Sequence, residues 1–161
     1  MAIRNIREMG DDILRKKSKP VKEMTERLRT MIDDMYETMY ETMGVGLAAP
    51  QIGILKRIVV IDIGDGEQIT LINPVIVEKE GEQIGDEGCL SVPNKVGTVK
   101  RPNRVVCEAL NEEMEAIRVE GEGFLARAIC HECDHLDGIL YPDVAEGPIV
   151  DLRDLEENVE E

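Results

Sequence analysis

The sequence predicts an α+β fold in which mostly antiparallel strands pack around a central helix. Three features lead to this prediction: a long amphipathic segment before residue 45, several short β-branched segments divided by turns, and a second helical segment near residue 130. With 161 residues, the chain has the length of one ordinary domain. We expect that domain to occupy residues 1–150 and an acidic tail to follow at residues 151–161.

The charge of the chain limits its partners. There are 34 acidic and 19 basic residues, which give a formal net charge of −15. Phosphate backbones and anionic lipids repel so acidic a surface, so we expect neither nucleic acid nor a membrane as a partner. No apolar run approaches the roughly 20 residues needed to span a bilayer. The N-terminus has no secretion signal, so the predicted location is the cytoplasm.

The first helix is expected from Thr25 to Met43, after a surface arm that ends at Pro20. A methionine-rich stripe of this kind can form an adaptable binding groove, but a core-facing stripe is the commoner explanation and the one we adopt. Its apolar side chains recur at three- and four-residue spacing: Leu28, Met31, Ile32, Met35, Met39 and Met43.

A loop rich in glycine and alanine follows the helix, from Gly44 to Gly53. Small residues let the backbone pass close to another group, and Gln51 offers an amide that can donate and accept. A phosphate-binding loop is disfavoured because the lysine and hydroxyl pair of that motif is missing.

The strands are expected in the middle of the chain, where β-branched residues alternate with turn signals at 64–66 and 73–74. The last two form a hairpin around residues 111–113. The predicted strands are Ile54–Ile63, Ile69–Ile72, Val75–Val77, Arg104–Leu110 and Met114–Glu120.

The central helix contains both histidines of the chain, His131 and His135, with Glu132 directly after the first. Residues four apart lie one turn apart on the same face of a helix, so both imidazoles can reach one metal ion. This H-E-x-x-H pattern is typical of metal sites in which the glutamate handles protons. A surface helix with two solvated histidines is the simpler alternative, but the approach from 124 to 130 is mostly apolar and favours a buried site.

Four cysteines in a chain without an export signal are expected to be reduced thiols or metal ligands. Cys130 and Cys133 form a C-x-x-C pair, but they lie about 120° and about 180° round the helix from the midpoint of the histidines. We therefore expect both to pack in the core. Cys89 is the candidate third ligand, because a site that leaves one position open needs three protein ligands and accepts such a mixture.

Three blocks of this sequence, in order, resemble the bacterial type of the peptide deformylase family. They are Gly44–Gln51 (GVGLAAPQ), Glu87–Ser91 (EGCLS) and His131–Leu136 (HECDHL). The resemblance extends over about residues 1–145, and it implies removal of the formyl group from the initiator N-formylmethionine of new polypeptides, with release of formate.

The resemblance also implies a metal site. Cys89, His131 and His135 would hold one divalent metal, usually ferrous iron (Fe2+) in the cell, and Glu132 would be the general acid/base. Softness and coordination geometry do not separate iron from Zn2+, Ni2+ or Co2+ in the isolated protein.

The substrate contacts follow from the same resemblance. Gln51 and the backbone N–H of Leu90 would bind the formyl oxygen, and the backbone around Val45, Gly46 and Gly88 would hold the peptide in an extended form.

Two further groups of residues are expected near the site. An apolar pocket for the methionine side chain could be walled by Val45, Phe124 and Ala128. The free N–H groups of the histidine ligands need acceptors, for which we expect Asp134 and Glu87.

Two departures from the family pattern concern Cys130, where many relatives have glutamine, and the tail. Some bacterial members end in a basic helix thought to dock on the ribosome. Residues 151–161 have one arginine and six acidic residues, so transient ribosome contact through this tail is doubtful.

Two other functions fit parts of the sequence. An H-E-x-x-H metalloprotease would need a third histidine where this chain has Tyr141, or a downstream glutamate such as Glu156 or Glu157. A non-catalytic, metal-stabilised interaction domain would keep the ligands without turnover.

Overall fold

The computed structural model describes residues 2–154 of the chain. Its elements follow in this order: η1 (Asp12–Arg15), α1 (Glu26–Glu41), β1 (Gly46–Ala48), η2 (Ala49–Ile52), β2 (Ile58–Ile61), β3 (Ile69–Glu80), β4 (Gln83–Cys89), β5 (Val92–Arg101), β6 (Arg104–Leu110), β7 (Ala116–Glu122), α2 (Phe124–Leu136), η3 (Tyr141–Asp143) and β8 (Val150–Asp151).

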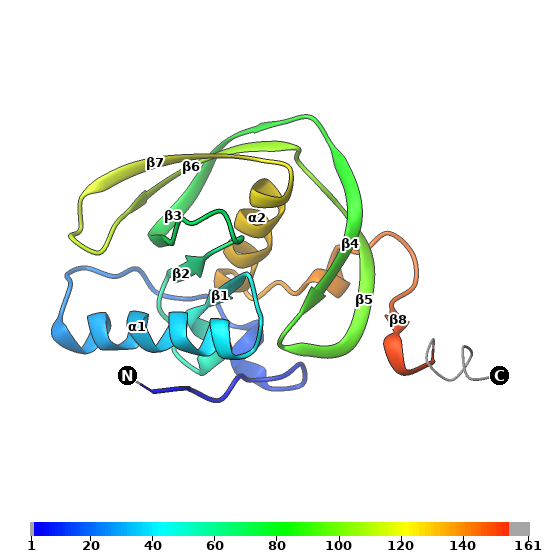
Figure 1. Cartoon of the computed structure of the whole chain (residues 1–161), viewed down its shortest axis with the longest axis horizontal. Coiled ribbons are helices and arrows are strands. Elements are labelled where there is room, and N and C mark those ends of the chain that lie inside the picture. Colours follow the sequence, from blue (N-terminus) through cyan, green and yellow to red (C-terminus); the bar gives the residue numbers. More distant parts are fainter. Residues whose placement is uncertain (1, 155–161) are drawn as a thin grey trace.

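The strands form two sheets, and α2 lies among them (Figure 1). A five-stranded sheet has the order β1-β2-β3-β6-β7, a three-stranded sheet has the order β4-β5-β8, and every neighbouring pair of these strands is antiparallel. Helix α2 packs against β7 at Gly121, where an added Cβ would lie 3.0 Å from Cδ1 of Ile129. The predicted α+β class, with antiparallel strands around the motif-bearing helix, is confirmed.

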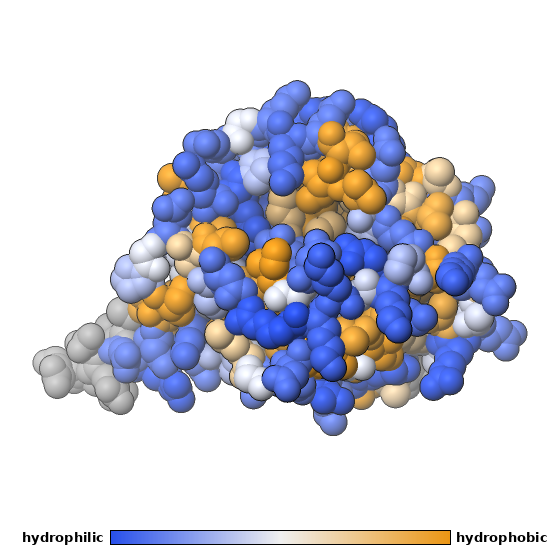
Figure 2. All heavy atoms as spheres, turned by 180° about the vertical axis from the view of Figure 1, so that it is seen from behind, coloured by the Kyte–Doolittle hydropathy of each residue, from blue (hydrophilic) through white to orange (hydrophobic). Residues whose placement is uncertain are grey.

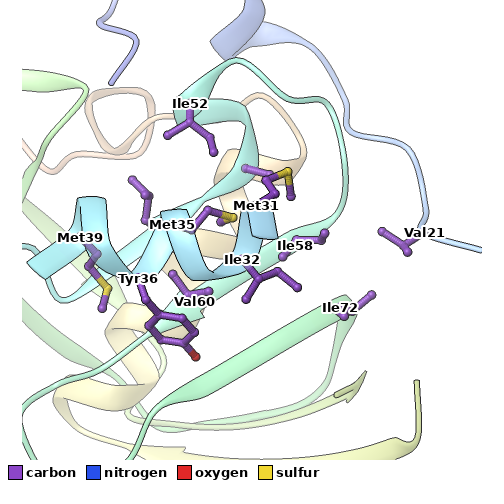
Figure 3. Packing of buried hydrophobic residues seen from close by; sticks show 12 residues of the cluster. Val21, Met31, Ile32, Met35, Tyr36, Met39, Ile52, Ile58, Val60 and Ile72 are labelled. Carbon is purple, nitrogen blue, oxygen red and sulfur yellow. The ribbon is translucent and has the colours of Figure 1, made fainter. Parts of the chain in front are cut away.

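Helix α1 covers the other side of the five-stranded sheet. Thr25 caps its N-terminus by accepting a hydrogen bond from the backbone of Leu28. The methionine stripe faces the core: Met31, Met35 and Met39 are at most 3 % exposed, and Figure 3 shows them beside Ile52, Ile58 and Val60. The core interpretation of the stripe is confirmed for these residues.

Met43 departs from that prediction. Helix α1 ends at Glu41, and Met43 follows with a left-handed backbone (φ 60°) and a side chain that is 90 % exposed. The apolar spacing in the sequence continues to Met43, although the helix ends before it. Periodicity alone does not show where a helix stops, so the prediction placed the helix end too late.

The predicted strands differ from the observed ones in several places: β1 lies inside the stretch predicted as a loop, and β2 covers only Ile58–Ile61 of the predicted Ile54–Ile63. The predicted turn at Asn73–Pro74 is wrong, because β3 continues through these residues with an irregular register. Asn73 has a φ of 51°, and its side-chain amide accepts from the N–H and donates to the carbonyl of Val21, both at 2.8 Å. Strands β4 and β5 were not predicted, because β4 is rich in glycine and acidic residues, which are scarce in strands. The hairpin β6–β7 was predicted, with β6 at its observed bounds.

The N-terminal segment is more firmly attached than a surface arm. Residues 2–9, which we call the N-terminal strap, run below α1 in Figure 1. Most of their side chains are exposed, but the N–H of Arg7 donates to the carbonyl of Gln51 and the N–H of Met9 to that of Ser91, both at 2.7 Å. Further on, Leu14 is 1 % exposed.

The predicted tail begins inside a strand. Asp151 pairs with Lys95 and Val150 with Val96, so β8 extends the sheet of β4 and β5. Residues 155–161, the rest of that tail, lie outside the described part of the chain.

The outer surface is largely polar. Figure 2 shows one face covered mainly by hydrophilic residues, with separate apolar patches between them. Among residues 2–154, none of the helices combines the length and the apolar character needed to cross a bilayer.

The methionine stripe gives a matched pair of variants. Met35→Ala should lower the free energy of unfolding by about 2–5 kcal/mol, because a fully buried side chain is lost from a packed core. Met43→Ala should change it by less than about 0.5 kcal/mol, because that side chain is solvated. Denaturant unfolding of the two variants checks this, and equal effects would contradict the observed packing.

Candidate active site

Helix α2 brings the two histidines together and β4 adds the cysteine. His131 and His135 lie one turn apart, are 9 % and 1 % exposed, and have ring centroids 5.1 Å apart. Cys89, at the end of β4, places its Sγ 3.4 Å from Nε2 of His135. One donor atom from each of these three residues lies within 4.8 Å of the others.

This donor set fits a transition-metal ion. Sulfur and imidazole nitrogens suit borderline and soft cations, and three protein ligands leave a position open. Burial lowers the pKa of His135 well below its usual value, which favours the neutral form of the ring that binds a metal. Among residues 2–154, no other group of three or more His, Cys, Asp or Glu side chains is placed to hold a metal ion.

A buried charge network holds His131 in place. Glu87 lies 2.7 Å from Nδ1 of His131, where it accepts the ring N–H, and it also accepts hydrogen bonds from Arg101 (2.8 and 2.9 Å) and Arg127 (2.6 Å). Burial acts to raise the pKa of Glu87, but the hydrogen bonds from Arg101 and His131 outweigh it and hold the pKa at about 2. The expectation that Glu87 accepts from a histidine is confirmed.

The same expectation is wrong for Asp134, which accepts from Nη1 of Arg101 at 2.7 Å instead. No acceptor faces Nδ1 of His135 among the described residues. Arg101 and Arg127 were missed by the sequence reasoning. The one available signal was an arginine between Ala126 and Ala128, in an otherwise apolar stretch of helix.

Glu132 points away from this network. It is 5 % exposed, its Oε1 has no hydrogen-bond partner in the described structure, and burial raises its pKa to about 7. Its carboxylate lies against the backbone of β1 at Gly46, where an added Cβ would stand 2.5 Å from Oε2. Only a glycine at residue 46 lets the carboxylate occupy this position.

Gln51 lies beside the cluster with its amide fixed at both ends. Its Oε1 accepts from the N–H of Ala48 at 3.0 Å, and its Nε2 donates to Oγ of Ser91 at 3.1 Å and lies 3.7 Å from Sγ of Cys89. Ser91, which is fully buried, was noticed in the sequence only as the end of the EGCLS block.

A cavity of about 540 Å³ opens beside these groups. Its wall includes Phe124 and Ala128, and Leu90, which lies in the turn between β4 and β5. His135 is the only sequence-predicted site residue outside the lining, which contains the others: Val45, Gly46, Gln51, Gly88, Cys89, Leu90, His131 and Glu132.

The other cysteines and Tyr141 are not ligands in this arrangement. Cys130 and Cys133 pack in the core with Ile129 and Leu136, as expected, and burial raises the pKa of Cys130 to about 11. Tyr141 stacks on the ring of His131 at a centroid distance of 6.2 Å. The glutamates that a protease would require lie outside the described residues.

The fold and the site together define a metallohydrolase: a donor set of a half-buried cysteine and two buried histidines, a free carboxylate and a cavity that reaches both. The model of one family, polypeptide deformylase, matches residues 3–148. The chain belongs to the polypeptide deformylase family.

Similar proteins agree with this assignment. A peptide deformylase of Acetivibrio thermocellus is 66 % identical over 143 residues, which cover 89 % of this chain and 84 % of the relative. One of Lachnoclostridium phytofermentans is 56 % identical over the whole of both chains. The crystal structure of a peptide deformylase from Legionella pneumophila superposes with a TM-score of 0.87 at 46 % identity, and the match covers 89 % of this chain and 86 % of that one. The chain is an enzyme, and its family depends on a metal.

Gly46→Ala tests the close approach of β1 to α2. The added methyl group should displace the carboxylate of Glu132 and lower the rate of formate release by at least about tenfold, since a misplacement of about 1 Å can cost a factor of 100. Metal content and the melting temperature should change little. Unchanged turnover of a formyl-methionyl peptide would show that the carboxylate works from another position.

Proposed function

We propose that the cavity beside α2 is where this enzyme removes the N-formyl group from the initiator methionine of nascent polypeptides and releases formate. The observation that carries this proposal is the juxtaposition of three converging donor atoms with an unpartnered carboxylate at one cavity. Its direct test is the release of formate from a short formyl-methionyl peptide by the purified protein.

Cys89, His131 and His135 would hold one divalent metal. A bound metal of this kind supplies Lewis acidity, which polarises the formyl carbonyl and makes water a stronger nucleophile near neutral pH. We propose Fe2+ as the ion used in the cell, with Zn2+, Ni2+ or Co2+ as substitutes. Metal analysis of protein purified without oxygen should therefore find one equivalent of iron.

Glu132 is the proposed general acid/base. Its buried Oε1 has no other partner in the described structure and its residue lines the cavity, so it can take a proton from the attacking water. The leaving amine then needs a proton, and the same carboxyl group can deliver it. One group thus serves both halves of the hydrolysis.

The formyl oxygen gains negative charge as water attacks, and two donors are proposed to stabilise it. The Nε2 group of Gln51 has two hydrogens: one is donated to Oγ of Ser91, and the other is directed at Sγ of Cys89 over a long 3.7 Å contact that the formyl oxygen would replace. The backbone N–H of Leu90 follows Cys89 directly in the turn after β4. Fixed donors of this kind need no reorganisation during the reaction.

The peptide part of the substrate would lie extended along the backbone of Val45, Gly46 and Gly88. The methionine side chain would enter the apolar part of the cavity near Phe124 and Ala128. These substrates arise on ribosomes in the cytoplasm, where we place the enzyme. Residues 151–161 are acidic, which makes this segment a poor anchor on the ribosome. Any contact with the ribosome would therefore be transient and would use another surface of the enzyme.

Cysteine substitutions separate the proposed ligand from the core thiols. Cys89→Ser should lose metal and activity, because a neutral hydroxyl replaces a thiolate in a set of three ligands. Cys130→Ser should keep a full equivalent of metal, since its thiol packs in the core. Metal analysis after gel filtration gives the comparison, and stoichiometric loss from Cys130→Ser would contradict the assignment.

Glu132→Gln separates binding from chemistry. The amide keeps the size of the side chain but removes its basicity, so formate release should fall by at least about two orders of magnitude. Metal stoichiometry and the melting temperature should stay near those of the wild type. Loss of the metal would make the glutamate a ligand, and full activity would remove it from the mechanism.

A further inference from the structure

The side chain of Gln51 and the ligand Cys89 come from two different sheets. Gln51 lies in η2, next to β1 of the five-stranded sheet, whereas Cys89 ends β4 of the three-stranded sheet and Ser91 lies in the turn that follows it. No strand of one sheet pairs with a strand of the other among the described residues. Apart from the short chain connections between β3 and β4 and between β5 and β6, the separation between the amide donor of Gln51 and Cys89 therefore depends on contacts that cross between the sheets.

The N-terminal strap makes two such contacts. Its residues 7 and 9 are two apart in a chain without helical structure, and their N–H groups donate at 2.7 Å to the carbonyls of Gln51 and Ser91. Gln51 and Ser91, the two residues whose carbonyls accept from the strap, also form a hydrogen bond with each other through their side chains at 3.1 Å. The strap thus holds the backbone at both ends of the Gln51–Ser91 hydrogen bond.

The strap is itself anchored to α1. The N–H of Ala2 donates to Oδ1 of Asp34 at 2.7 Å, and the N–H of Arg4 donates to Oγ1 of Thr38 at 2.9 Å. The guanidinium group of Arg4 forms an ion pair with Asp34 at 2.9 Å, and the carboxylate side chain is only 4 % exposed. The strap cannot slide along the site without breaking these contacts.

We propose that the N-terminal strap is a positioning element for catalysis: the amides of Arg7 and Met9 fix the Gln51 donor relative to Cys89. The inference rests on the function proposed above. The strap touches neither substrate nor metal, so its loss should act on the rate of the chemical step through Gln51 and leave metal binding intact.

Proline at residue 9 removes the hydrogen bond from its N–H to the carbonyl of Ser91, and because its Cδ takes the place of the amide hydrogen, it also pushes the strap away from Ser91. Residues 8–11 form a turn closed by the N–H of Asp11 and the carbonyl of Glu8 at 3.0 Å, and Gly10 has the positive φ (108°) that a type II turn needs at its third position. Proline is well suited to the second position of such a turn, which is residue 9. Met9→Pro therefore removes the N–H donor and keeps the turn, and Met9→Ala is its matched reference.

Met9→Pro should lower kcat for a formyl-methionyl peptide by about tenfold to a hundredfold relative to Met9→Ala, with little change in KM or in metal stoichiometry. In a Gln51→Ala background the same proline should cause no further loss, because the group it positions is gone. Asp34→Ala, which frees the strap at α1 and leaves residues 7 and 9 intact, should lower kcat in the same direction by a smaller factor. This second variant keeps the test decisive if the proline variant does not fold.

Four results would overturn the proposal: equal kcat for Met9→Pro and Met9→Ala, an undiminished loss in the Gln51→Ala background, loss of the metal with the proline, or an unchanged kcat in Asp34→Ala. If neither wild type nor Met9→Ala releases formate, it is the proposed function that fails.

Discussion

The carboxylate of Glu87 is the group on which the arrangement of the site depends. It is buried, it accepts the ring N–H of His131, and it is neutralised by Arg101 and Arg127. Asp134 balances the second positive charge through Arg101, so two carboxylates and two guanidinium groups compensate one another. A buried ion pair that loses one partner costs about 3–5 kcal/mol, so every member of such a network is constrained by the rest. The network joins β4, β5 and α2, and with them the histidine and cysteine ends of the donor cluster.

The active site lies at the boundary between two sheets, and each sheet contributes different functional groups to it. Helix α2 packs on the five-stranded sheet and supplies the histidines and the free carboxylate. The three-stranded sheet supplies Cys89 and the turn that contains Leu90. Because the sheets share no strand pairing among the described residues, side-chain and strap contacts, together with the short β3–β4 and β5–β6 connections, set the distance between their contributions. Few residues therefore control the geometry of the whole site.

Local patterns in the sequence were enough for α1, for the helical spacing of the two histidines and for the hairpin that contains Arg104–Leu110, because each depends on neighbours in the chain. Cys89 was proposed because two histidines leave a three-ligand site one ligand short, and the roles of the residues around it came from the resemblance to a family, since β4 has no strand-like composition. The roles of Arg101 and Ser91 were found by neither route, although Ser91 ends the EGCLS block. Their roles depend on partners 33 and 40 residues away, and nothing local marks a buried arginine or serine. The bulge at Asn73 was hidden for the same reason, because its side chain bonds Val21, 52 residues earlier.

The bare backbone at Gly46 also limits how this enzyme could change under selection. A compound that fills the cavity and lies along β1 would contact the backbone of residue 46. No larger residue can replace this glycine to block the compound, because its side chain would occupy the position of the Glu132 carboxylate. Resistance to such a compound would have to arise at the more exposed rim, where Val45 and Phe124 have room to vary. Inhibitor groups placed against the strand should therefore keep their contacts longer than groups placed at the rim.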